Sequence, residues 1–249
     1  MGNLFKFELF KINKQKKLLA MVGSVLIFQL IMAIFIKYNE DFMSYEKGVQ
    51  YSFLGPILVN VNIIFLTCTM FAEDFEYLTI IPIKTKYPNI SKLILVKLIV
   101  ILLMHVILLF LCASITMVLS FVLLKYKPGL GMIKSVYLYN FSMIVPISIV
   151  VMLSSIVIMI TKKEKTGLVL GLLIYMFYGF GTGFNFLIIK KLSIFKYGII
   201  NLLNLPNQLI DSQYINLTQL SISNMIITSV VYLVIESLIL YKISKEIEV

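Results

Sequence analysis

The chain has 249 residues, of which 60% are hydrophobic and only 14% are charged, and its mean hydropathy is +0.98. Polar side chains are too few to cover a water-soluble protein of this size, so the composition excludes a soluble globular domain and indicates an integral membrane protein. The net charge of +10 comes from 22 basic residues, all of them lysine and mostly at the ends of hydrophobic runs. This argues against a nucleic-acid partner, because base and phosphate recognition favours arginine.

Residues 3–17 are predicted to form an interfacial helix that leads into the first span. Its apolar face consists of Leu4, Phe5, Leu9 and Ile12, whereas Phe7 and Phe10 fall outside that face. An aromatic helix edged with lysines suits the headgroup boundary, where rings sink and ammonium groups meet anionic lipid. Membrane lipid is therefore an expected partner. The apolar run that follows is long enough to span, so it is interpreted as a retained anchor and not as a cleaved signal peptide.

Six segments are long and apolar enough to cross the hydrocarbon core: 18–36, 53–71, 98–124, 136–160, 167–189 and 225–243. Their hydrophobicity is continuous and does not alternate, which favours helices over barrel strands. The predicted fold class is an all-α polytopic membrane protein, formed by a single transmembrane domain over residues 1–249.

The distribution of lysine predicts the orientation. With the N-terminus inside, the inner segments hold 14 lysines and the outer segments hold 8. Six spans return the chain to the same side, so both termini are expected in the cytoplasm of a multi-pass plasma-membrane protein.

Residues 194–210, IFKYGIINLLNLPNQLI, are apolar but are broken by Gly198, Asn201, Asn204 and Pro206. The segment is too interrupted to span and too hydrophobic for a free loop. An outer re-entrant or interfacial helical hairpin before the last span is favoured, since neighbouring helices can shield its backbone. The alternative is an amphipathic loop on the outer leaflet.

Hydrolytic and metal chemistry lack the residues they need. The single histidine, His105, lies inside the third run, where it is interpreted as a packed or hydrogen-bonded core residue. No Walker A loop, GxSxG turn or histidine pair occurs in the sequence, so no catalytic residue, metal site or directly bound cofactor is expected. Cys68 and Cys112 fall in apolar runs and are interpreted as small buried residues.

Several residues inside the spans are candidates for a transport pathway or a gate: Asn60, Asn62, Gly179, Gly181, Gly183 and Glu236. Amides in a span usually hydrogen-bond to a neighbouring helix, and this interpretation is preferred for the two asparagines. The glycines fit either a gate or a subunit contact. Glu236 could stay protonated, pair with Lys242 or line a polar path, because a buried charge in a membrane is costly.

The stretch FAEDFEYLTIIPIKTKYPNISK, residues 71–92, interrupts the hydrophobic runs with acid first and base second. Glu73, Asp74 and Glu76 come before Pro82 and a lysine-rich turn. Acidic residues at the start of a helix and lysines at its end both complement the helix dipole. The pattern predicts a short helix that lies across the membrane surface.

Residues 76–98, EYLTIIPIKTKYPNISKLILVKL, resemble the first cytoplasmic loop of ABC-2-type transporter permeases. The positions that match are Asp74, Glu76, Tyr77, Thr79, Pro88 and Lys97, whereas Leu78 stands where the family usually has glycine. The resemblance implies that residues 73–92 form a coupling helix docked on a cytoplasmic ABC ATPase. Its contacts would be Glu73, Asp74, Glu76, Tyr77 and Thr79, with a smaller contact from Lys162, Lys163 and Glu164.

The chain is similar to permeases of peptide-toxin exporters, including lantibiotic-immunity and phenol-soluble-modulin subunits. This similarity implies a permease without enzymatic activity that expels amphipathic peptides. ATP and Mg would be bound by the partner ATPase, and a second permease subunit, identical or different, would complete the channel. The alternatives are an ABC exporter of drugs or other lipophilic molecules and a stand-alone ion-coupled transporter that uses Glu236. A membrane binder or sensor is disfavoured because no soluble domain is evident.

Overall fold

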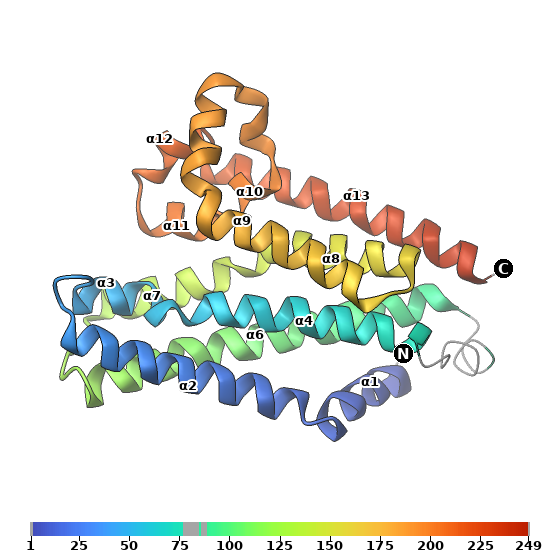
Figure 1. Cartoon of the computed structure of the whole chain (residues 1–249), viewed down its shortest axis with the longest axis horizontal. Helices are drawn as coiled ribbons and strands as arrows, with labels where there is room; N and C mark the ends of the chain where they lie inside the picture. The colour runs from blue at the N-terminus through green and yellow to red at the C-terminus, as the bar shows by residue number, and fades with distance from the viewer. Residues whose placement is uncertain (1, 77–84, 86–88, 249) are drawn as a thin grey trace.

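The computed structural model describes residues 2–76, 85 and 89–248, and all regular structure within them is helical (Figure 1). Six helical segments are long and apolar enough to cross a membrane: Lys17–Tyr38, Ser52–Glu76, Ile90–Val122, Leu130–Thr161, Glu164–Lys191 and Ile222–Ile247. The predicted all-α polytopic fold is therefore confirmed, and the chain is a multi-pass membrane protein.

The main helices are α1 (Gly2–Lys14), α2 (Lys17–Tyr38), α4 (Gly55–Glu76), α6 (Ile90–Val122), α7 (Leu130–Ser142), α8 (Ile144–Thr161), α9 (Glu164–Lys191) and α13 (Ile222–Glu248). The short helix α3 (Tyr45–Gln50) follows α2. The third span begins earlier than its predicted start at residue 98, because the side chain of Asn89 accepts a hydrogen bond from the backbone N–H of Lys92 (3.0 Å) and caps α6.

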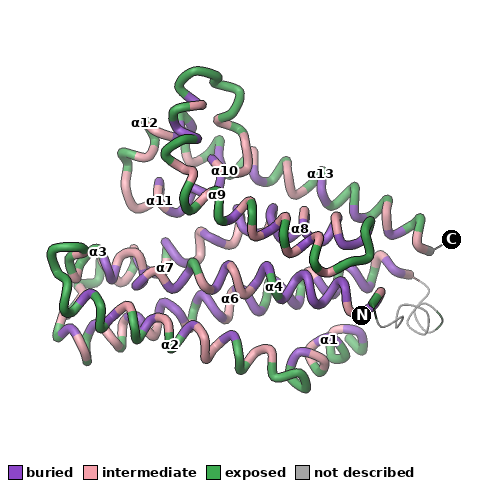
Figure 2. The backbone as a smooth tube through the Cα atoms, in the orientation of Figure 1, coloured by how far each residue is buried: buried purple, intermediate pink, exposed green. Residues whose placement is uncertain are grey.

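Helix α4 lies at the centre of the bundle and packs against α2, α6, α8 and α9. Figure 2 shows buried residues along most of α4, whereas α9 and α13 carry exposed residues along much of their length. The exposed side chains of these outer helices are mainly large and apolar. Such a surface is expected for helices that face lipid.

A left-handed turn precedes α4. Ser52, Phe53 and Leu54 have φ angles of 50°, 45° and 59°, a conformation that costs about 1–2 kcal/mol for each residue other than glycine. Gln29 on α2 holds this turn, because its Nε2 donates hydrogen bonds to the carbonyl oxygen of Ser52 (3.2 Å) and to Oγ1 of Thr116 on α6 (2.7 Å). The turn therefore depends on two neighbouring helices.

The broken segment before the last span forms four short helices: η2 (Ser193–Tyr197), α10 (Ile199–Leu202), α11 (Leu205–Ile210) and α12 (Tyr214–Thr218). Its polar residues hold it together. Asn201 donates to the carbonyl of Thr218 (3.0 Å), and Gln208 donates to the carbonyl of Leu220 (2.7 Å). Asn201, one of the residues that interrupt the apolar run, is thus buried within the segment that it stabilises.

Candidate functional site

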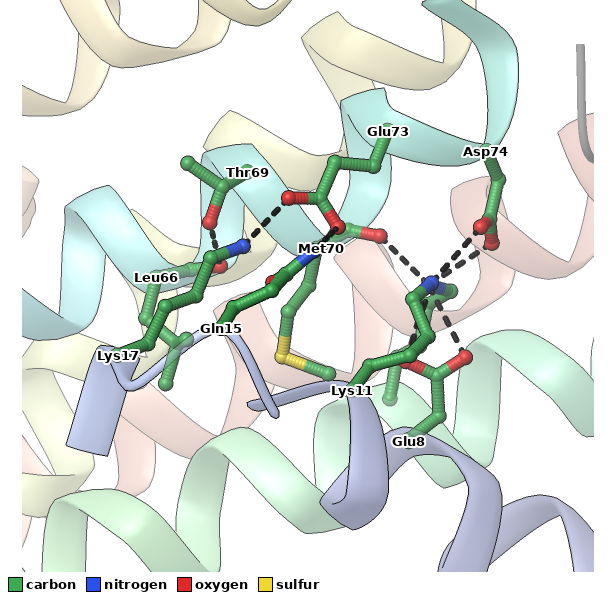
Figure 3. Close-up of polar contacts among 10 residues, drawn as sticks. Glu8, Lys11, Gln15, Lys17, Leu66, Thr69, Met70, Glu73 and Asp74 are labelled. Carbon is green, nitrogen blue, oxygen red and sulfur yellow. Dashed lines mark hydrogen bonds and ion pairs between the residues drawn. The ribbon is translucent and has the colours of Figure 1, made fainter. Parts of the chain in front are cut away.

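Six charged side chains gather where α4 ends: Glu8, Lys11, Lys17, Glu73, Asp74 and Lys97. We refer to them as the α4 ion-pair cluster. They come from α1, α2, α4 and α6. Figure 3 shows Glu8, Lys11 and Lys17 directed towards Glu73 and Asp74 on the last turns of α4. No other group of ion pairs occurs among the described residues.

Asp74 is the centre of this cluster. Its carboxylate is 2% exposed and lies 2.9 Å from Nζ of Lys97 and 3.0 Å from Nζ of Lys11. Lys97 also donates to the backbone carbonyl of Met70 (2.5 Å) and lies 3.4 Å from Glu8. Two acids and two bases therefore balance each other in a largely buried site, which is the condition under which buried charges are tolerated.

Glu8 is the second acid of this charge balance, and it was not among the site residues selected from the sequence. It is fully buried on the face of α1 that also carries Leu4 and Ile12, four residues away on each side. This spacing is the sequence signal, because a residue midway between two core positions of a helix lies on the same face. Burial by itself lowers the pKa of Lys11, but the charges of Glu8 and Asp74 outweigh it and raise the pKa above 10.5.

An outer ion pair closes the cluster on the side of α2. Nζ of Lys17 lies 2.5 Å from Oε1 of Glu73, and the two side chains are 19% and 16% exposed. Gln15, in the link between α1 and α2, donates a longer bond to the same carboxylate (3.4 Å). The start of α2 is thereby attached to the end of α4.

Glu76 joins α4 to the second inner loop. Its carboxylate accepts a hydrogen bond from the backbone N–H of Glu164 (3.1 Å), at the first residue of α9. An anion in this position satisfies an unpaired helix N–H group and complements the positive end of the dipole. Glu76, Lys162 and Lys163 are exposed, so this junction lies on the surface of the described chain.

These observations correct two expectations. The carboxylates do not begin a surface helix; they end α4, because the apolar run before them carries the helix through Glu76. Asp74 is buried and paired within the chain, so it offers no surface to a partner protein. Tyr77 and Thr79 lie outside the described residues, as does most of the predicted coupling helix.

The asparagines of the second span bond to three neighbouring helices. Nδ2 of Asn60 donates to the hydroxyl of Tyr175 on α9 (3.0 Å), and Nε2 of His105 on α6 lies 3.1 Å from its Oδ1. Asn62 donates to Ser24 on α2 (3.0 Å). These bonds tie α4 to helices on both sides of it. Cys68 and Cys112 are buried and free, as expected.

The close helix contact of α9 does not involve the glycines selected from the sequence. A methyl group added at Gly179 or Gly183 meets no other atom within 4 Å, and one added at Gly181 meets only the ring of Phe177, one turn away. In contrast, a methyl group at Gly171 would lie 2.5 Å from Oγ of Ser154 on α8. Gly167 is similarly confined against α8, so the first half of α9 is the tightly packed half.

Glu236 lies on the buried face of α13 and is 2% exposed. Neither of its carboxylate oxygens has a hydrogen-bond partner, and no basic side chain in the described part of the chain, Lys242 included, lies within 4 Å. Of the three alternatives considered for Glu236, pairing with Lys242 is therefore absent from this structure. A buried carboxyl group without a partner in a span marks a candidate functional position.

No group of three or more histidine, cysteine or acidic residues among the described residues could hold a metal ion. The sequence matches no protein-family model, and it has no significant match among curated proteins.

Proposed function

We propose that the chain is the membrane subunit of an exporter of the ABC-2 type. It is driven by ATP hydrolysis in a separate cytoplasmic ATPase, which binds the ATP and Mg, and it pairs with a second permease subunit. Two features support the proposal: the sequence resemblance of residues 76–98 to the coupling loop of such permeases, and the ion pair that joins α4 to α6, the helices before and after this stretch.

The arrangement at the end of α4 is the observation that carries the proposal. Buried ion pairs fasten three helices together there: α1, α4 and α6. The partly exposed pair of Lys17 and Glu73 adds α2, and the hydrogen bond of Glu76 adds α9. A displacement of the loop between α4 and α6 is therefore passed to all five helices together. Packed helices commonly move as rigid bodies, and in this way a small local displacement leads to a change in the conformation of the whole protein.

We assign the docking of the ATPase to the exposed residues at the junction of α4 and α9. Glu76, Lys162 and Lys163 lie at the same junction and provide both signs of charge. Asp74 acts differently: it holds the helices that receive the movement. The substrate class that we assign is an amphipathic peptide, with drugs and other lipophilic molecules as the alternative within the same transporter class.

The test is reconstitution of the chain in vesicles with and without a candidate cytoplasmic ABC ATPase from the same organism. ATP-dependent export of a labelled amphipathic peptide is expected only when both proteins are present. Charge reversal of Lys162 and Lys163 to Glu should weaken co-purification of the ATPase and lower export. The matched control reverses Lys190 and Lys191, which lie at the other end of α9 and should have no effect. Normal export after the first reversal would contradict the assigned docking surface.

The unpaired carboxyl group of Glu236 favours one second candidate, a stand-alone ion-coupled transporter. Such a protein needs an ionisable group within the membrane. Transport by vesicles that contain this chain alone, without nucleotide but with a proton gradient, would support it. Glu236→Gln should then abolish transport, whereas in the exporter the same change should leave ATP dependence intact.

A further inference from the structure

A groove runs between α6 and α13 on the outside of the bundle. Near the start of α6 it is a hollow of about 320 Å³, and its walls include Leu95 and Leu98 on α6 and Leu240 on α13. A second hollow of about 240 Å³ lies between α6 and α8, where Leu102 is part of its wall, and Leu233 on α13 also lines it. Leu98 lines both hollows, so the two are adjacent along α6. Leu95 and Leu102 are 46% and 45% exposed, so the groove opens outward, to the side that faces lipid.

The length of the groove matches one leaflet of a bilayer. Lys92 and Leu102 are ten residues apart on a continuous helix, which corresponds to about 15 Å along its axis. Half of a typical hydrocarbon core is also about 15 Å thick. The stretch from Lys92 to Leu102 is therefore about as long as an acyl chain that spans one leaflet.

The polar groups of the groove are concentrated at one end. Asn89, Ser91, Lys92 and Ser244 line the first hollow, and the hydroxyl groups of Ser91 and Ser244 join α6 to α13 (2.6 Å). Figure 1 shows that this end is shared by the beginning of α6 and the C-terminal end of α13. Further along, the lining residues are mostly apolar, and the polar exceptions are Ser237, Ser148 and His105. A groove with one polar end and one apolar end fits an amphiphile and not a soluble ligand.

The charge at the polar end is positive. Lys92 is exposed and makes no ion pair with any carboxylate of the described residues, and it lies in the first turn of α6, where the helix dipole also favours an anion. Basic pockets between membrane helices, close to the headgroup level, attract anionic lipid headgroups. We propose that the α6–α13 groove binds an anionic phospholipid, with its phosphate at Lys92 and one acyl chain along Leu95, Leu98 and Leu102.

The proposal does not rest on the exporter assignment, because it uses only the groove and its charge. An amphipathic peptide is the competing occupant. A phospholipid fits better, since the stretch from Lys92 to Leu102 is about as long as one leaflet, and Lys92, the one charged side chain among the described lining residues, sits at its polar end. A helical peptide, with its side chains, is about 10–12 Å across. That is too wide for hollows of about 320 and 240 Å³.

The chain contains no tryptophan, which makes a direct test possible. Tyr241 lines the first hollow, so Tyr241→Trp would place a single indole at the polar end of the groove. Its fluorescence is measured in nanodiscs that contain phosphatidylcholine or phosphatidylglycerol with brominated acyl chains, which quench a nearby indole. The reference is Phe180→Trp, at an 89% exposed position on α9. Stronger quenching by the anionic lipid is expected at position 241 only.

The preference for phosphatidylglycerol over phosphatidylcholine at position 241 should be about fivefold in relative binding constant, as for one lysine near a membrane surface. Lys92→Gln in the Tyr241→Trp background should remove it, and Lys190→Gln should not. Equal quenching by both lipids, or a preference that survives Lys92→Gln, would overturn the proposal. Displacement of the brominated lipid by an amphipathic peptide, but not by unlabelled phosphatidylglycerol, would assign the groove to peptide and also overturn it. Unchanged helical circular dichroism confirms that each variant is folded.

Discussion

Replacement of Lys97 by methionine tests the role of the α4 ion-pair cluster. The Lys97 side chain is 3% exposed and contacts Asp74, Glu8 and the backbone carbonyl of Met70. Methionine keeps the apolar stem of lysine and removes the charge, so Lys11 alone remains to balance two carboxylates. Removal of one partner from a buried pair typically costs about 3–5 kcal/mol, because the other charge is left uncompensated.

The outer pair of the cluster provides the matched comparison. Lys17 and Glu73 are both partly exposed, so Lys17→Gln should cost at most about 1 kcal/mol. The free energy of unfolding of both variants can be measured in mixed detergent micelles from the loss of the helical circular dichroism signal. A double variant, Lys97→Met with Asp74→Asn, removes one charge of each sign and should be less destabilised than the sum of its single variants.

The reasoning fails if Lys97→Met and Lys17→Gln have the same small cost, since burial would then have no influence on the pair. It also fails if Asp74→Asn and Lys97→Met are additive. Additive effects would mean that the two side chains contribute independently, which the 2.9 Å contact between them does not allow.

Three further predictions concern other parts of the chain. Gln29→Leu should lower the free energy of unfolding by about 1–3 kcal/mol in the same micelle assay, because the left-handed turn before α4 loses its donor. Gly171→Val should lower the thermal midpoint and Gly183→Val should leave it unchanged, since only the first site is packed against another helix. The raised pKa of Lys11 means that its contribution is complete below pH 10.5 and is lost as the pH rises through the higher pKa of the folded state. The stability of the natural chain should therefore fall more steeply over that alkaline range than that of Lys11→Met; parallel curves would contradict this.

The spans were predictable because run length and continuity decide whether a segment can cross a membrane. Their ends were not, since polar residues near a span are compatible with either a loop or a further turn of helix. The third span shows this: the cap at Asn89 and the buried partners of Lys97 extend α6 well before residue 98.

The candidate site was only partly predictable, for a different reason. The carboxylates of the stretch from residue 71 are evident in the sequence, but their partners lie 63 residues away for Lys11 and 56 for Lys17. A single sequence contains no information about such distant pairs. The glycines illustrate the same limit: the spacing GxxxG occurs at Gly167 and Gly171 and again at Gly179 and Gly183, yet only the first pair meets a neighbouring helix.

Every member of the α4 ion-pair cluster lies within the first 97 residues of the chain. Because a ribosome delivers the N-terminus first, α1, α2 and α4 are available to one another before α8, α9 and α13 have been made. The early half can thus neutralise its own buried charges during biogenesis, without waiting for the late half. The remaining helices can then pack against N-terminal helices whose buried charges are already paired.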